Sequence, residues 1–374
     1  MPKNIFSEAS DNGIFRDEKF LYPEFVPERL PYRDAQIDEL VHSFQPVLKG
    51  GKPQNVFVFG GSGTGKTVTV KFVLRELEAF SNRAKGLYLN CFEFNTRQAI
   101  LNQICLFLGV PVPRRGIATD EVYSEMLLAL KKADFVPIIV LDELDQLLSS
   151  GAASLVLYDL LRVVEFQKSR LGIVIISNNE MLVSKLDDRV RSSLLHNPVE
   201  FAQYTPIQLK EILKERAKYA FTENALDPEV INVAAGHAAK HQGDARLAIE
   251  SLLRAGRIAS REGASKVQVS HLRSAFDSIH SRALDKAKNF LDENEKNILR
   301  LLCEEDNVFS GRLFEKFQKR FGEKALTQRS FRKKLNRLES LKLLKTEPVD
   351  KGIRGRTRTI KLAQPKKEIE SALN

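Results

Sequence analysis

Short apolar runs and stretches of helical periodicity alternate along the first half of the chain. The apolar runs have the length typical of buried strands: 56–59, 86–90, 136–141 and 172–176. Apolar residues recur at helical spacing in the segments between them or beside them: 34–48, 99–108 and 120–130. This alternation of strands and helices predicts an α/β domain.

The second half of the chain has a different pattern. Its spacing is entirely helical from 206 to 281. Three further helices are then predicted at 294–304, 310–321 and 327–341, followed by two strands at 343–347 and 358–362 around a glycine-broken basic tip. Three helices and a hairpin predict a winged helix-turn-helix, whose third helix suits a major groove and whose hairpin suits phosphates or a neighbouring groove. The polar and basic residues of these two elements are candidate DNA contacts: Gln328, Arg329, Arg332, Lys333, Arg354, Arg356 and Arg358.

The distribution of charge supports this interpretation. Residues 286–374 hold 23 Lys and Arg against 13 Asp and Glu, so they carry the whole net charge of +10 and the rest of the chain is balanced. A polyanion would therefore bind the last quarter of the chain. Two alternatives stay open, because basic helices are often solvated faces and some winged helices bind proteins.

Length and composition limit the class of protein. A chain of 374 residues is expected to form two or three domains. No apolar run approaches the roughly 18 residues of a membrane span, and the N-terminus lacks an apolar signal segment, so we expect neither membrane insertion nor export. Three scattered cysteines without metal-ligand spacing favour reduced thiols in a cytosol-like compartment.

A glycine-rich loop lies between the first predicted strand and the following helix, in the spacing G-x-x-x-x-G-K-[ST]: Gly60-Gly61-Ser62-Gly63-Thr64-Gly65-Lys66-Thr67. Strand, loop and helix are the context that a phosphate-binding loop requires. The glycines let backbone N–H groups surround phosphate oxygens, and the helix N-terminus adds positive charge. Lys66 would neutralise the β- and γ-phosphates, and Thr67 would place its hydroxyl on Mg²⁺. We therefore predict binding of a nucleoside triphosphate.

Polar residues follow two later strands. Asp142 and Glu143 end the run 136–141, where Asp142 would hold the metal beside Thr67 and Glu143 would polarise the attacking water. Asn178 follows the run 172–176 and can orient that water, although asparagine at a strand end is more often a turn former. Asp145 either joins this group or favours the N-terminus of the next helix.

Arginines and an extended leader complete the candidate site. Arg246 falls in the first turn of a predicted helix, where the helix dipole disfavours a cation, so either a γ-phosphate or an acidic side chain would face it. Arg189 and Arg191 either reach a nucleotide on a neighbouring subunit or are surface charges. The proline-rich segment 22–33, with Val26 and Arg29, either packs on an adenine ring or is a strap on the core.

Taken in order, these motifs resemble an AAA+ ATPase. More narrowly, the leader 26–33, the stretch 188–194, the Gly-Asp-Ala-Arg sequence at 243–246 and the terminal winged helix resemble the archaeal origin-recognition and replication-initiator proteins. These are similar to a eukaryotic origin recognition complex subunit and its helicase-loading partner. The resemblance covers about residues 15–365.

The resemblance implies a fold and a set of roles. It implies a three-layer core with a parallel sheet at 21–204, a helical lid at 205–285 and a winged helix at 286–365. The polar residues 1–20 lack periodicity and are expected to be flexible, and residues 366–374 are expected to form a tail. It also implies an initiator-specific insertion at about 92–131 that touches DNA, which makes Arg114 and Arg115 candidate phosphate contacts. By the same resemblance Glu143 is the catalytic base and Asn178 the first sensor. Arg246 is the second sensor, and Arg189 is preferred to Arg191 as the trans-acting finger. The family often has Asp where this chain has Asn179, so a charge near the γ-phosphate is absent.

The expected function is a slow ATPase that works as a switch, binds duplex DNA at replication origins with ATP or ADP and Mg²⁺ as cofactors, and helps to recruit a replicative helicase and other initiator subunits. A nucleoid-associated protein of the cytoplasm is implied. The alternatives are a DNA-bound AAA+ regulator or transposition helper, and a signalling ATPase whose winged helix binds protein.

Overall fold

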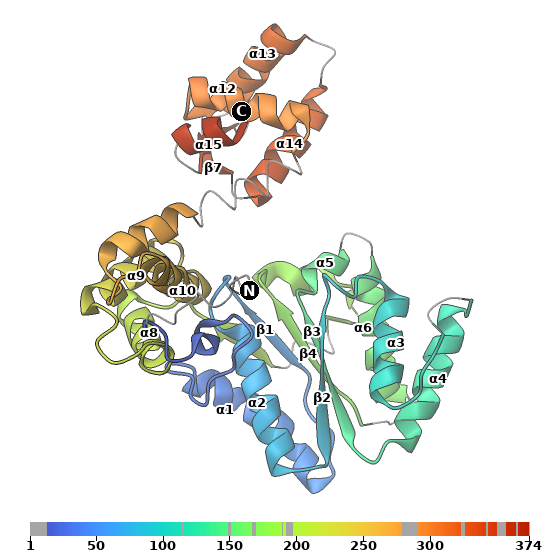
Figure 1. Ribbon diagram of the computed structural model, residues 1–374. Helices are drawn as coiled ribbons and strands as arrows, with labels where there is room; N and C mark the ends of the chain where they lie inside the picture. The colour runs from blue at the N-terminus through green and yellow to red at the C-terminus, as the bar shows by residue number, and fades with distance from the viewer. Residues whose placement is uncertain are drawn as a thin grey trace, which may run out of the picture. The chain divides into compact units, whose positions relative to one another are not determined.

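The chain divides into two compact units, Met1–Leu272 and Arg273–Asn374, and each is described by itself (Figure 1). The structure is a computed structural model. It describes these residues: 13–113, 116–148, 151–166, 170–188, 190–191, 197–278, 291–322, 326–341, 343–349, 357–363 and 366–373. Among the described helices, none has both the length and the apolarity needed to cross a bilayer.

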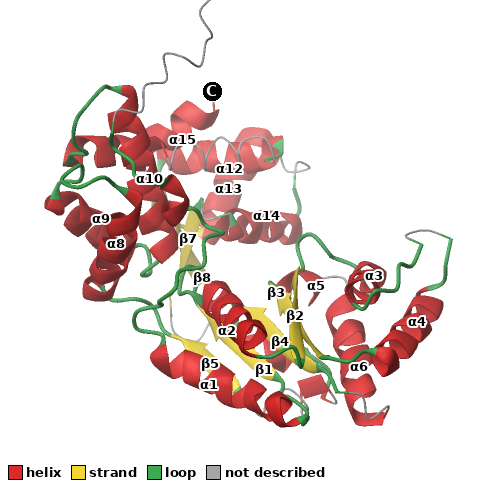
Figure 2. Ribbon diagram, turned by 60° about the horizontal axis from the view of Figure 1, so that its bottom comes forward, coloured by secondary structure: helices red, strands yellow, loops and turns green. Residues whose placement is uncertain are grey.

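A five-stranded parallel sheet forms the centre of the first unit (Figure 2). The strands are β1 Val56–Gly60, β2 Ala84–Asn90, β3 Val136–Asp142, β4 Gly172–Ser177 and β5 Pro198–Phe201, in the order β2-β3-β4-β1-β5. Four of them lie where apolar runs predict strands, whereas β5 was not predicted. Because all strands are parallel, the carboxyl ends of β1, β3 and β4 share one edge of the sheet.

Helices cover both faces of the sheet (Figure 1). The 3₁₀ helix η2 Gln45–Lys49 follows α1 Asp34–Phe44, which lies with α2 Lys66–Phe80 on one face. The helices α3 Arg97–Phe107, α4 Thr119–Lys132 and α6 Ala152–Phe166 lie on the other, and the short α5 Asp145–Leu148 and η3 Glu180–Lys185 follow β3 and β4. Successive residues of β3 enter opposite cores, Ile138 with the first group and Ile139 with the second, as the pleat of a strand requires. The expected three-layer core is present.

The rest of the first unit is helical, as the spacing predicts. It contains α8 Pro206–Ala220, α9 Pro228–Lys240 and α10 Ala245–Arg261, and a helical stretch at 269–278 begins at its end. Polar N-caps start these helices: Thr205 forms a capping box with Gln208 before α8, and the carboxylates of Asp227 and Asp244 accept backbone N–H groups of α9 and α10. These helices lie in the range expected for the lid.

The N-terminal segment is packed from residue 13 onward, so the expected flexibility is wrong for 13–20; residues 1–12 lie outside the described residues. Ile14 is buried, and Phe15 forms a β-bridge to Phe221 and stacks on its ring at 5.0 Å. The 3₁₀ helix η1 Glu18–Leu21 follows and buries Leu21. The alternation in this short polar stretch is too brief to reveal such packing, because the apolar partners lie about 200 residues later in the chain.

The second unit is a winged helix, as predicted. It consists of α12 Glu293–Glu304, β6 Val308–Phe309, α13 Ser310–Phe321, α14 Gln328–Ser340, β7 Leu344–Val349, β8 Thr357–Leu362 and α15 Lys366–Leu373. The strands form an antiparallel sheet in the order β6-β8-β7. Phe317 of α13 and Phe331 of α14 are fully buried and pack against each other with ring centres 5.4 Å apart.

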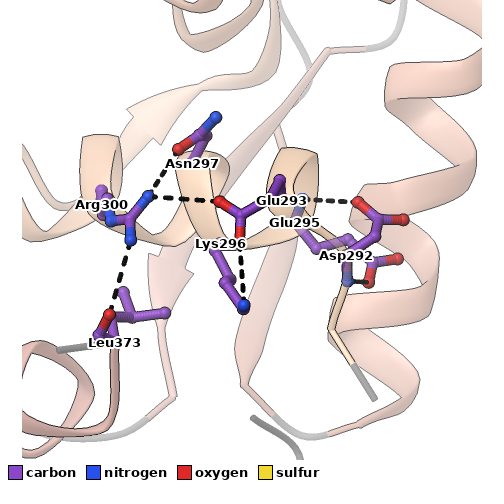
Figure 3. A network of polar contacts seen from close by, with 7 residues as sticks. All are labelled: Asp292, Glu293, Glu295, Lys296, Asn297, Arg300 and Leu373. Atoms are coloured by element: carbon purple, nitrogen blue, oxygen red, sulfur yellow. Dashed lines mark hydrogen bonds and ion pairs between the residues drawn. The ribbon is translucent and has the colours of Figure 1, made fainter. Parts of the chain in front are cut away.

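The expected C-terminal tail is wrong, because residues 366–373 form the helix α15 and belong to the core of the second unit. Ile369 is 1% exposed and Leu373 is 9% exposed. Figure 3 shows Arg300 of α12 donating to the carbonyl of Leu373, at 3.5 Å, near the capping box that Asp292 and Glu295 form at the start of α12. A lysine-rich sequence beyond the last strand resembles a solvated end, but its two buried apolar residues are four positions apart, on one helical face.

Candidate functional site

The glycine loop connects β1 to α2, as the sequence predicts. Gly60, Gly63 and Gly65 have φ values of 144°, 69° and 91°, a backbone region that favours glycine. A Cβ on Gly60 would lie 2.3 Å from the carbonyl oxygen of Phe201, and one on Gly65 would lie 2.7 Å from the hydroxyl of Tyr204. Phe201 and Tyr204 therefore require glycine at both positions. Loops of this kind bind phosphate oxygens through their backbone N–H groups.

The side chain of Lys66 is enclosed by this loop and is 6% exposed. Its Nζ donates to the carbonyls of Gly60 at 2.9 Å and Gly61 at 2.6 Å, and to Oδ1 of Asn178 at 2.8 Å. Burial lowers the pKa of the Lys66 ammonium, partly opposed by the charge of Glu143. The loop thus holds a cation at the carboxyl edge of the sheet.

Asp142, at the end of β3, accepts two hydroxyl groups at the same oxygen. Thr67 Oγ1 and Tyr88 OH each donate to Asp142 Oδ2 at 2.7 Å. Burial, and then the charge of Asp142, raise the pKa of Tyr88, so this phenol is a donor at all ordinary pH values. The Thr67 hydroxyl and the Asp142 carboxylate are the hard oxygen ligands that Mg²⁺ prefers. Tyr88 was not identified from the sequence, because alternation in β2 distinguishes the faces of a strand but not which tyrosine reaches a carboxylate.

Glu143 and Asn178 are joined directly. Asn178 Nδ2 donates to Glu143 Oε2 at 2.7 Å while its Oδ1 accepts from Lys66, so one amide connects the cation and the acid. Burial raises the pKa of Glu143, and the hydrogen bond from Asn178 opposes that rise. Glu143 has φ 57°, a strained value for a residue with a side chain, and such strain clusters at functional sites.

The two other polar residues near these strands have local partners. Asn179 Oδ1 accepts from the backbone N of Met181 at 2.9 Å, at the start of η3. Asp145 Oδ2 accepts from Ser177 Oγ at 2.8 Å, so its carboxylate ties α5 to the end of β4. Asn179, where the family often has Asp, thus caps a helical turn.

The first turn of the lid helix α10 rests on the phosphate loop. Ser62 Oγ donates to Asp244 Oδ2 at 3.1 Å, and the backbone N of Ala245 donates to the carbonyl of Gly63 at 3.2 Å. Arg246 is exposed in the same turn. Its charge lowers the pKa of Lys66 and of Glu143, although burial is the largest influence on each pKa. Arg246 thus lies near the phosphate loop, and its contact with a γ-phosphate stays a prediction.

A cavity of about 1820 Å³ lies between leader, loop and lid of the first unit. Val26 and Arg29 line it, together with the aromatic side chains of Phe20, Phe25 and Tyr219. The rings of Phe20 and Tyr219 stack with centres 5.2 Å apart. A cavity lined both by aromatic side chains and by residues of the phosphate loop suits a purine nucleotide.

The basic residues of the winged helix divide into paired and solvent-facing groups. Lys334 and Arg337 of α14 form ion pairs with the N-terminal acids of α12, and Arg358 donates to Asn336 Oδ1 at 2.8 Å. The predicted DNA contacts on α14 are all exposed: Gln328, Arg329, Arg332 and Lys333. Arg191 pairs with Asp188 at 2.6 Å. The remaining predicted arginines lie outside the described residues: Arg114, Arg115, Arg189, Arg354 and Arg356.

Family models match all three parts of the chain. Residues 50–182 match an AAA domain, residues 210–277 a Cdc6 AAA+ ATPase-type lid domain, and residues 298–372 a CDC6 C-terminal winged helix domain. The last match extends through most of α15, in agreement with its place in the core.

Relatives match over nearly the whole length. The chain is 38% identical over 381 residues to an ORC1-type DNA replication protein of Thermococcus kodakarensis, with 93% of this chain and 88% of that protein covered. It is 36% identical to ORC1-type DNA replication protein 1 of Archaeoglobus fulgidus, with 99% and 92% covered. A solved structure of the Aeropyrum pernix ORC1 protein in complex with DNA is similar with a TM-score of 0.82 and 32% identity, over 96% of this chain and 97% of that one. The chain belongs to the ORC1-type DNA replication proteins, AAA+ ATPases with a Cdc6-type lid and a C-terminal winged helix.

Proposed function

We propose that this protein is an ATP-dependent replication initiator that binds duplex DNA at origins and changes state with its nucleotide. The observation that carries the proposal is the contact of the first turn of α10 with the phosphate loop, through Asp244 and Ala245. Any change in that loop on loss of the γ-phosphate acts directly on the lid. The winged helix follows the lid in the chain, and we propose that the nucleotide state influences its binding to DNA.

Each residue of the site has a chemical task. Lys66 neutralises the β- and γ-phosphates, and Glu143 accepts a proton from the attacking water that Asn178 orients. Thr67 and Asp142 hold Mg²⁺, which supplies charge neutralisation for the phosphate oxygens. Arg246 contacts the γ-phosphate from the lid, and Arg189 of a neighbouring subunit is the finger. The hydrogen bond from Asn178 lowers the pKa of Glu143 and so makes it a weaker base, which supports slow hydrolysis and a switch function.

The exposed face of α14 is the main DNA surface. Arg329, Arg332 and Lys333 are exposed there, whereas Lys334 and Arg337 are occupied by acids of α12. Arginine on a recognition helix suits a guanine edge, and the wing residues Arg354, Arg356 and Arg358 suit phosphates, as do Arg114 and Arg115 of the insertion. A replicative helicase and other initiator subunits are the proposed protein partners.

A titration of labelled duplex DNA at several salt concentrations, with ATP or with ADP, tests this function. Six to eight phosphate contacts give a slope of log K against log salt of about −5 to −7, and the affinity or footprint differs between the nucleotides. Absence of binding, or binding without salt dependence, would favour a winged helix that binds protein. Mapping bound sites across the genome separates an initiator from a regulator, since only the initiator concentrates at origins.

A further inference from the structure

Arg33 lies behind the phosphate loop and is 4% exposed. Its Nε and Nη2 both donate to the carbonyl oxygen of Thr64, at 3.0 and 2.7 Å, and Nη2 also donates to the carbonyl of Ala202 at 2.9 Å. Nη1 donates to the carbonyl of Tyr32 at 3.1 Å. One buried side chain from the end of the leader therefore holds the middle of the loop and the segment that follows β5.

The guanidinium is surrounded by carbonyls and aromatic rings. It lies 3.9 Å from the ring centre of Tyr204 and 5.3 Å from that of Phe201, and no carboxylate of the described residues forms an ion pair with it. Burial lowers the pKa of Arg33, opposed by Tyr204, but a guanidinium stays charged in proteins. A positive charge without a neighbouring carboxylate thus lies under the loop.

The hydrogen bonds to Thr64 have a geometric consequence for the next residue. The carbonyl of Thr64 and the N–H of Gly65 belong to one trans peptide and point in opposite directions. Holding the carbonyl toward Arg33 therefore directs the N–H of Gly65 away from Arg33, to the other side of the loop. The hydroxyl of Tyr204, whose ring packs on the Arg33 guanidinium, leaves no space for a Cβ on Gly65, so only glycine fits beside this pair.

We propose that Arg33 is a positioning residue for the nucleotide phosphates: it orients the Thr64–Gly65 peptide and adds a buried positive charge behind the loop. The inference rests on the proposed binding of ATP. It differs from a purely structural role, in which Arg33 would only fasten the leader and thereby shape the base-binding cavity. If Arg33 acts on the phosphates, its loss lowers the affinity for ATP and ADP more than the affinity for AMP. If Arg33 only fastens the leader, its loss lowers the affinity for all three nucleotides equally.

The test is competition binding of ATP, ADP and AMP to the full chain and to the variants Arg33→Gln and Arg33→Lys. Loss of one charge and of the paired hydrogen bonds lowers the affinity of Arg33→Gln for ATP and ADP about tenfold, with AMP changed less than about twofold, because AMP lacks the β- and γ-phosphates. Arg33→Lys keeps the charge without the bidentate geometry and recovers part of the loss. Thermal unfolding without nucleotide shows that both variants are folded.

Arg75→Gln is the matched control. Arg75 fastens the same leader through the carbonyls of Val26 and Pro27, at 3.2 and 3.3 Å, from further along α2. Its loss changes the affinities for the three nucleotides by equal factors. An equal loss for ATP, ADP and AMP in Arg33→Gln, or no loss at all, overturns the inference. Failure of the unaltered protein to bind any of the three would instead refute the proposed nucleotide function.

Discussion

Replacing Asn178 with alanine removes an amide that contacts both Lys66 and Glu143. Each of these hydrogen bonds joins the amide to a charged group, and such a bond is worth about 1.5–3 kcal/mol. If the transition state for hydrolysis depends on one of them to orient the attacking water, turnover falls about 10- to 100-fold. Lys66 keeps its two carbonyl partners, so the affinity for ATP changes by less than about threefold.

The pH dependence of the same variant gives a second readout. Burial raises the pKa of Glu143, and the hydrogen bond from Asn178 lowers it. Removing Asn178 therefore moves that pKa further upward. Because the base acts only when ionised, the acid limb of the turnover profile moves to higher pH, and the loss is larger near about pH 6 than near about pH 8.

The assay is steady-state phosphate release at saturating ATP across this pH range, with the affinity for ATP measured in parallel. Asn179→Ala is the control, because the side chain of Asn179 caps Met181 and contacts neither Lys66 nor Glu143 within the described geometry. It changes turnover by less than about twofold at every pH. Equal losses in the two variants, or an unshifted acid limb in Asn178→Ala, would refute the assignment of Asn178.

Four further substitutions probe the other parts of the chain. Lys66→Ala lowers the affinity for ATP at least about 100-fold in a fluorescence titration, and retained binding would contradict its role. Glu143→Gln keeps binding but loses about 10²- to 10⁴-fold in turnover, so surviving phosphate release would exclude it as the base. Phe317→Ala destabilises the second unit by about 3–5 kcal/mol in thermal unfolding and leaves nucleotide affinity unchanged. Arg332→Ala weakens binding to the preferred duplex by about 1–3 kcal/mol and relaxes the sequence preference at one position, whereas unchanged affinity and preference would remove it from the interface.

The core and its phosphate loop could be predicted because their signals are local. Buried parallel strands are continuous apolar runs, and the loop, Asp142 and Glu143 follow such runs directly. The strand β5 was missed because Pro198–Phe201 is short and alternates in burial at the edge of the sheet. It resembles a turn until its pairing with β1 is known.

Other features depend on contacts between distant segments and could not be predicted. Nothing near Arg33 in the sequence indicates that its partner is the carbonyl of Thr64, 31 positions later. The contact of Ser62 with Asp244 joins residues 182 positions apart. Both contacts join segments that the sequence analysis recognises as motifs. A motif, however, identifies contacts with a ligand more readily than contacts within the protein.

The strand order has a consequence for how this protein is made. β1 emerges first from the ribosome, yet both of its neighbours, β4 and β5, are synthesised more than a hundred residues later. Until then its two edges are unpaired, and an apolar strand with open edges is prone to associate with other chains. The N-terminal segment stays without its partner for longer than β1, because Phe15 pairs with Phe221, which is synthesised after β5. Completion of the core sheet therefore requires translation at least through Phe201, and nascent chains shorter than this are expected to depend on chaperones.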